Sequence, residues 1–114
     1  MTPATDANAA RLKREVKIAH RLVTDALAAG YSVSVYDGED WAIRQSTARA
    51  AICNALCSTD EDVLHFHPEK PGPVAGWVRL IWGNDCDLIS DASDNPAMAA
   101  LLKGAEALAE RLAR

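Results

Sequence analysis

The chain has 114 residues, the size of one domain with a single hydrophobic core. Hydrophobic residues make up 49% and charged residues 25%, a globular composition that excludes disorder along the whole chain. The net charge of -4 at pH 7 argues against a general nucleic-acid binder, because such proteins neutralise phosphates with basic residues.

The apolar stretches and the cysteines indicate the compartment. No apolar stretch approaches the roughly 20 residues of a membrane span, and the polar start lacks the apolar region of a signal peptide. Cys53, Cys57 and Cys86 form no disulfide pattern, so we expect free thiols in a reducing compartment. We therefore expect a cytoplasmic protein without membrane contact, with a single domain over residues 1–114 and a frayed N-terminus over residues 1–8.

Two helices are predicted in the first half of the chain. Apolar residues recur every three or four positions over residues 6–29 and predict a helix that ends at Gly30. A second helix is predicted to begin after Ser46, whose hydroxyl can accept a hydrogen bond from a free amide of the first turn. We expect this helix to end near Ser58.

A hairpin lies between these helices. Residues 31–36 alternate between apolar and polar side chains, which is typical of a half-buried strand. Asp37-Gly38 is a hairpin turn signal because glycine tolerates a positive φ. Residues 41–44 form the predicted return strand, in which we expect both Trp41 and Ile43 to point inward.

Three further strands are predicted after the second helix. Residues 63–67 alternate, so their two histidines should point away from the core. Residues 76–82 are apolar except for Arg79 and predict the central strand of the sheet, which should begin near Val74. Both faces of that strand should be partly covered, or one face should be a contact surface. A short fifth strand is predicted at residues 87–90.

The chain is predicted to end in a helix that covers the sheet. Asn95 is its expected N-cap and Pro96 its first helical residue, where a missing amide costs nothing. The predicted order is α-β-β-α-β-β-β-α. We therefore predict an α+β fold with a five-stranded, mostly antiparallel sheet and helices packed on one face.

This topology predicts that three acidic loops lie at one edge of the sheet, because alternating strands return the chain there. The edge would carry Asp37, Glu39, Asp40, Asp60, Glu61, Asp62, Asp85 and Asp87. These acids can contact a partner by imitating phosphate charge, bind a divalent cation, or be ordinary polar loops. The basic half of the first helix should face the same edge, and mutual neutralisation of the two is a further interpretation.

Other polar residues allow two weaker site hypotheses. Arg14, Lys17 and Arg21 share one helical stripe that can meet phosphates or an acidic protein, or can simply be solvated. His65 and His67 share one face of a strand, and the cysteine pair Cys53/Cys57 shares one face of the predicted second helix. Both residue types bind metals, but no established metal motif is present, and cysteines among aliphatic residues are commonly core residues.

Enzyme motifs are absent from the sequence. It has no G-x-S-x-G, no phosphate-binding G-x-x-x-x-G-K and no G-x-G-x-x-G. His65 beside Cys86 or Asp87 would still lack an orienting third group. We therefore expect neither an enzyme nor a cofactor.

Three segments carry a resemblance to known proteins. They are GYSVSVYDGEDW (residues 30–41), STDED (residues 58–62) and GWVRLIWGND (residues 76–85), with LISD behind them. In these segments the chain resembles small proteins of unassigned function carried by bacteriophages and prophages. The resemblance implies an accessory protein that binds and modulates or inhibits a host or phage protein complex, including anti-defence roles such as those of anti-CRISPR proteins.

The sequence thus favours a small, non-enzymatic protein that binds a macromolecular partner. The contact surface would be the acidic edge or an uncovered sheet face with Trp77 and Arg79, since Trp and Arg are frequent in interface centres. We expect a monomer or a homodimer and do not expect nucleic acid as a partner. The alternative hypothesis is a metal- or small-molecule-binding domain that uses His65, His67 and the acidic loops.

Overall fold

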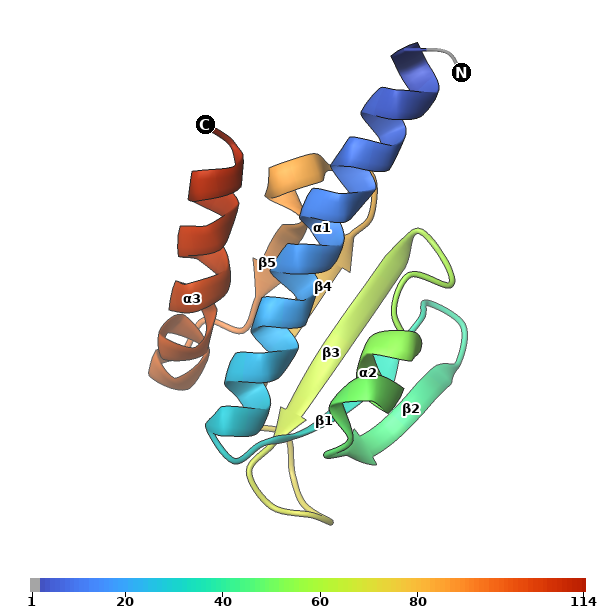
Figure 1. Cartoon of the computed structure of the whole chain (residues 1–114). Coiled ribbons are helices and arrows are strands. Elements are labelled where there is room, and N and C mark those ends of the chain that lie inside the picture. Colours follow the sequence, from blue (N-terminus) through green and yellow to red (C-terminus); the bar gives the residue numbers. More distant parts are fainter. Residues whose placement is uncertain (1–2) are drawn as a thin grey trace.

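The structure, a computed structural model, describes residues 3–114 and contains the predicted series of elements (Figure 1). These are α1 (Pro3–Ala28), β1 (Ser32–Tyr36), β2 (Trp41–Ser46), α2 (Arg49–Asn54), β3 (Glu61–His67), β4 (Gly76–Ile81), the short 3-10 helix η1 (Asp85–Asp87), β5 (Ile89–Ala92) and α3 (Pro96–Leu112). The predicted order and the α+β class are confirmed. The part of the frayed-terminus prediction that concerns residues 1 and 2 lies outside the described residues.

The five strands form one antiparallel sheet in the order β2-β1-β3-β4-β5. The central strand is therefore β3, and the prediction that residues 76–82 form the central strand is wrong. The apolar character of β4 does not come from burial on both faces. Val78 and Leu80 point into the core, whereas Trp77 and Ile81 alternate to the other face and are half-buried.

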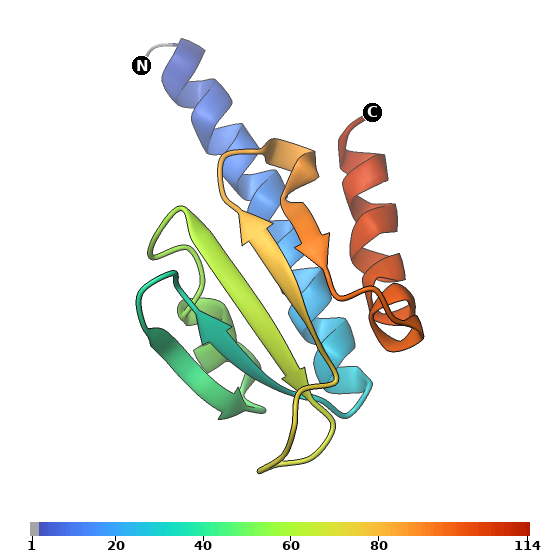
Figure 2. The ribbon, with the colours of Figure 1, turned by 180° about the vertical axis from the view of Figure 1, so that it is seen from behind.

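The core lies on one face of the sheet, called the covered face below, where all three helices of residues 3–114 pack. The opposite face, the open face, has no helix of the described residues over it (Figure 2). The fully buried side chains of the covered face include Ile18, Leu22 and Val23 from α1, Ile52 from α2, Met98 from α3, and Val33, Val35, Leu64, Phe66, Val78 and Leu80 from the strands.

The β1–β2 hairpin differs from its prediction because two irregularities interrupt its register. Tyr36 pairs with Trp41, whereas the preceding Val35 pairs with Ile43, so β2 contains an extra residue between these pairs. Such a bulge reverses which face the following side chains occupy. Ile43 packs against the core, but Trp41 lies on the open face, and the prediction that both point inward is wrong for Trp41.

The second helix is shorter than predicted. It covers residues 49–54, and its N-cap is Ala48 rather than Ser46. Ser46 is the last residue of β2, where its hydroxyl accepts a hydrogen bond from the amide of Ala48 at 3.1 Å. The helix stops before Cys57, which has a positive φ of 64°.

Two strands are displaced from their predicted bounds, and the last helix agrees with its prediction. β3 begins at Glu61, two residues earlier than expected, and the turn of η1 moves β5 to residues 89–92. Asn95 is the N-cap of α3, and its side chain accepts a hydrogen bond from the amide of Met98 at 2.9 Å.

Among residues 3–114, no helix combines the length and the apolar character needed to cross a membrane.

Candidate functional site: the open face and the acidic end

The open face is built from alternate residues of the strands. In β3 and β4, His65 lies opposite Trp77 and Val63 lies opposite Arg79. Because neighbouring residues of a strand point to opposite faces, the core-facing Leu64 forces these side chains outward. The predicted contact residues Trp77 and Arg79 therefore both lie on the open face.

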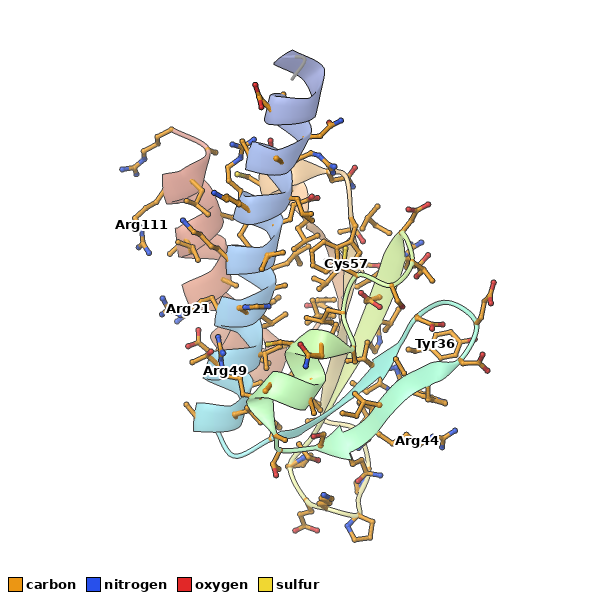
Figure 3. The ribbon with its side chains drawn as sticks, turned by 45° about the vertical axis from the view of Figure 1, so that its right-hand side comes forward. Arg21, Tyr36, Arg44, Arg49, Cys57 and Arg111 are labelled. Atoms are coloured by element: carbon orange, nitrogen blue, oxygen red, sulfur yellow. The ribbon has the colours of Figure 1, made fainter. Side chains whose placement is uncertain are left out.

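An aromatic cluster crosses this face from β2 to β4. The ring of Trp41 meets Tyr36 at a centroid distance of 5.2 Å and His65 at 5.0 Å, both edge-on. The guanidinium carbon of Arg44 lies 5.6 Å from the centre of the Trp41 ring, and Arg44 extends outward from β2 (Figure 3). Trp77 completes the cluster beside His65. These four rings are half-buried, and in the part of the chain that the structure describes no helix covers them.

Arg79 is held by an ion pair on the same face. Its Nε donates to Glu61 at 2.8 Å and its Nη2 to the second oxygen of that carboxylate at 3.1 Å. These hydrogen bonds raise the pKa of the Arg79 guanidinium. Two of the predicted site residues, Glu61 and Arg79, are therefore each other's partners, and both remain at the surface.

The three acidic loops meet at one end of the sheet, called the acidic end, as the topology predicted. The hydroxyl of Thr59 donates to the carbonyl of Asp37 at 2.6 Å, which joins the first loop to the second. The amide of Trp82 donates to the carbonyl of Asp60 at 2.9 Å, which joins the second to the third. The acids with exposed side chains in these loops are Glu39, Asp40, Asp60 and Asp87.

Two acids of this end have structural partners instead. Asp37 accepts hydrogen bonds from the amides of Glu39 and Asp40 at 2.9 and 2.8 Å, and these bonds lower the pKa of its carboxyl group. Asp85 accepts two hydrogen bonds from Arg14 at 2.6 and 2.7 Å, and this pairing lowers the Asp85 pKa to about 2. The predicted neutralisation of the acidic loops by the first helix is therefore confirmed for Asp85, whose charge is paired with Arg14.

Asp62 does not belong to the surface at all. Its side chain is fully buried because β3 begins at Glu61, which places residue 62 on the covered face. Oδ2 accepts from the amide of Cys57 at 2.8 Å and from Nε1 of Trp82 at 2.7 Å, whereas Oδ1 has no partner among the described residues. Burial raises the pKa of this carboxyl group. The prediction that Asp62 contacts a partner does not hold.

A second buried carboxylate, Glu15, was not singled out from the sequence. It accepts hydrogen bonds from the amides of Gly83 and Asp85 at 2.6 and 3.2 Å, and from Arg11 at 3.0 Å. Glu15 therefore anchors the β4–η1 turn to α1. The sequence did contain a signal for this buried carboxylate, because Glu15 lies on the apolar side of an amphipathic helix, where a charged residue requires hydrogen-bond partners.

The basic stripe of α1 is largely engaged with acids. Arg14 pairs with Asp85, and Arg21 pairs with Asp25 on the next helical turn at 2.9 Å. Lys17 is exposed. The stripe thus offers little free positive charge to phosphates, which agrees with the negative net charge.

His67 lies in a polar network below the open face. Its Nδ1 is 3.0 Å from the carbonyl oxygen of Gly72, and its Nε2 is 3.1 Å from the hydroxyl of Ser34. A carbonyl can only accept, so in the neutral imidazole Nδ1 carries the proton and Nε2 accepts from the Ser34 hydroxyl. The Ser34 oxygen also accepts from the amide of Gln45 at 2.8 Å. This network was not predictable, since it joins side chains and backbone groups of β1, β2 and β3 with the loop that follows β3.

The candidate metal ligands do not come together. Cys57 lies beyond the end of α2, so it does not share a helical face with Cys53. His67 is at the far end of β3 from the acidic loops, a separation of about 20 Å for a strand of this length. Among residues 3–114, no group of three or more His, Cys, Asp or Glu side chains is arranged to hold a metal ion.

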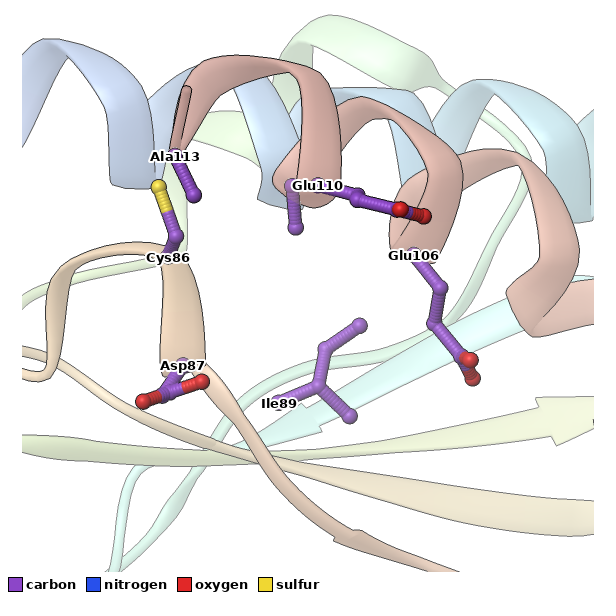
Figure 4. A pocket seen from close by; sticks show the side chains of 7 residues that line it. Cys86, Asp87, Ile89, Glu106, Glu110 and Ala113 are labelled. Atoms are coloured by element: carbon purple, nitrogen blue, oxygen red, sulfur yellow. The ribbon is translucent and has the colours of Figure 1, made fainter.

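A hollow of about 380 Å³ lies between η1 and α3 and is lined by Cys86, Asp87, Glu106 and Glu110 (Figure 4). The carboxyl groups point in different directions and do not converge on one point. Burial, followed by the neighbouring Asp85, raises the pKa of the Cys86 thiol. The thiol therefore stays protonated at neutral pH and is a poor nucleophile.

Comparisons of the chain with protein-family models, with curated proteins and with solved structures gave no significant match.

Proposed function

We propose that this protein is a non-enzymatic binding module that contacts a protein partner through the open face, with the acidic end beside it. The observation that carries the proposal is the aromatic cluster of Tyr36, Trp41, His65 and Trp77 on a sheet face without a helical cover. Aromatic side chains supply much of the binding energy in interface centres, and uncovered apolar patches mark contact surfaces.

The charge next to this cluster specifies the chemistry of the partner. Tyr36 and Trp41 flank the hairpin loop that carries the exposed Glu39 and Asp40, and the loop with Asp60 lies beside it. A partner that places apolar side chains on the cluster would therefore place basic residues at the acidic end. The resemblance to small phage proteins supports a host or phage protein complex as this partner, whose activity the binding would modulate or inhibit.

The alternative of a metal or small-molecule site shared by the histidines and the acidic loops has less support. His67 and the acidic loops lie at opposite ends of β3, so they cannot bind one small ligand. His67 is also engaged at both ring nitrogens.

Affinity capture from host lysate with matched charge-reversal variants tests the proposal. Glu39→Lys/Asp60→Lys changes two exposed acids at the acidic end, whereas Glu69→Lys/Asp94→Lys makes the same charge change at the opposite end of the sheet. We expect one complex that is captured by the wild type and the control pair, is released as salt rises, and is lost with the first pair. Equal capture by all three proteins would contradict the acidic-end contact.

A second copy of the chain is the competing occupant of the open face. Light scattering over a concentration series measures this directly. If the wild type is a dimer and Trp77→Ala makes it a monomer, the open face binds a second copy of the chain and not another protein. A wild-type monomer leaves the open face free for another protein.

A further inference from the structure

A small hollow of about 190 Å³ opens on the open face above β1, between side chains of β2 and β3. Its lining includes Ser34, Trp41, Arg44, His65 and His67, and contains no carboxylate. Four larger hollows elsewhere on the protein each include Asp or Glu in their linings. In a protein with a net charge of -4, this hollow is therefore a local site of positive charge.

Arg44 supplies the permanent charge. Its guanidinium carbon lies over the Trp41 ring, 5.6 Å from the ring centre, and among the described residues Arg44 forms no ion pair, in contrast to Arg79 on the same face. No hydrogen bond among the described residues occupies its N–H donors, so they are available to bind an anion. The N–H donors of Arg44 are thus available to a ligand, whereas those of Arg79 are engaged by Glu61.

Ser34 and His67 form the floor of the hollow, and their hydrogen bonds hold them in place as a structural support and not as a catalytic pair. Ser34 and His67 are buried and hydrogen-bonded to each other, with the carbonyl of Gly72 orienting the imidazole. The Ser34 hydroxyl is buried and its oxygen also accepts from the amide of Gln45, so it is held in place and not presented to a substrate as a nucleophile. The donors that remain for a ligand are those of Arg44 and His65, beside the side-chain amide of Gln45, whose oxygen accepts from the amide of Gly72.

His65 is the second group that can become cationic. Its ring is half-buried, and among the described residues no hydrogen bond occupies its nitrogens. Burial, followed by His67, lowers its pKa, so the imidazole is neutral at pH 7 without a ligand. The titratable or charged groups around it are His67 on β3, Arg44 on β2 and Tyr36 on β1. On β4, the uncharged Trp77 lies opposite it, and Arg79, which is paired with Glu61, follows on the same face.

We propose that this hollow binds a phosphate group, held by Arg44 and His65 above the floor of Ser34 and His67. A phosphate dianion matches one permanent and one inducible positive charge, whereas Arg44 alone neutralises a carboxylate. The volume of the hollow is several times the roughly 30 Å³ share of a water molecule, so it accommodates the five non-hydrogen atoms of phosphate. The group can be free phosphate or the end of a phosphomonoester.

NMR titration of the isolated protein with inorganic phosphate tests this site without any protein partner. We expect saturable shifts of the Trp41 indole and the His65 ring, a rise of the His65 pKa on binding, and an unmoved Trp82 indole. Acetate should bind more weakly. Absence of saturable shifts, or equal affinity for acetate, would overturn the assignment of a phosphate site.

Matched arginine variants locate the binding. Arg44→Gln should weaken phosphate binding about ten- to a hundredfold, the range for loss of a charge-assisted hydrogen bond. Arg79→Gln removes one arginine from the same face and should leave the affinity within about twofold, a difference of about 0.4 kcal/mol or less. Thermal unfolding checks that both variants fold, as expected for two exposed residues. Equal weakening by both would overturn the site in favour of diffuse attraction.

The source of the phosphate group is resolved by the same titration. A phosphoserine peptide that binds more tightly than inorganic phosphate, and loses this affinity with Arg44→Gln, assigns the site to a phosphorylated side chain. Tighter binding of inorganic phosphate assigns it to the free ion. Either result supports the site, and binding of the peptide that is insensitive to Arg44 contradicts it.

Discussion

The two faces of the sheet use the same strands for different purposes. On the covered face, aliphatic side chains and Phe66 are fully enclosed by the helices. On the open face, alternate residues of the same strands form a half-buried cluster of rings, with Arg44 and Arg79 beside it. Neighbouring residues of one strand should therefore have different roles. Those on the covered face stabilise the fold, and those on the open face bind a partner.

The largest expected effect comes from adjacent residues of β3. Phe66→Ala leaves a cavity in the covered face and should lower the free energy of unfolding by about 3 to 5 kcal/mol. His65→Ala on the open face should lower it by about 1 kcal/mol or less, because the ring is only half-buried. Chemical denaturation measures both values. If the two variants lost similar amounts of unfolding free energy, the open face would contribute to stability as much as the covered face does.

Asp62 gives the next largest effect and adds a pH dependence. Asp62→Ala leaves the amide of Cys57 and the indole of Trp82 without an acceptor, which should destabilise the fold by about 1 to 3 kcal/mol. Asp62→Asn keeps an acceptor for both donors and removes the buried charge, so it should be at least as stable as the wild type at pH 7.

The sign of the pH effect follows from the raised pKa of Asp62. Between the ordinary pKa of about 3.8 and the raised value, the folded state binds more protons than the unfolded state. Wild-type stability should therefore fall relative to Asp62→Asn as pH rises through that window. Denaturation at several pH values measures the difference, and a constant difference would contradict a buried, titrating Asp62.

The smallest effect concerns the surface pair Arg14–Asp85. The pKa of Asp85 is about 2, so its pairing stabilises the fold above the ordinary carboxyl range, and this contribution is lost as pH falls through about 2. Arg14→Gln should move the Asp85 pKa up toward 3.8. Carboxyl NMR titration checks this, with Arg21→Gln, which disrupts a separate pair, as the control. An unmoved Asp85 pKa would show that Arg14 does not hold the carboxylate.

Local signals predicted much of the fold, and contacts between distant segments explain the errors. The cap of α3 was predictable because Asn95 and Pro96 act within one turn. The position of Trp41 was not, because a bulge depends on how two strands pair. The early start of β3 buried Asp62, although its neighbours in sequence resemble an acidic loop.

The candidate site was predictable in part for the same reason. Alternation placed Trp77 and Arg79 on one face, and the topology brought the acidic loops to one end. The hollow around Arg44 could not be predicted, because Ser34, Arg44 and His67 come from three strands. Nor does sequence alone distinguish a free arginine from a paired one.

The most direct test of the binding proposal uses the three tryptophans of the chain as reporters. Trp41 and Trp77 lie on the open face, whereas Trp82 packs against the core and donates its indole N–H to Asp62 at 2.7 Å. Their indole N–H resonances should be recorded as the captured partner is added. We predict that the Trp41 and Trp77 resonances shift or broaden and that Trp82 does not. Binding that leaves both open-face indoles unchanged would contradict the open face as the contact surface.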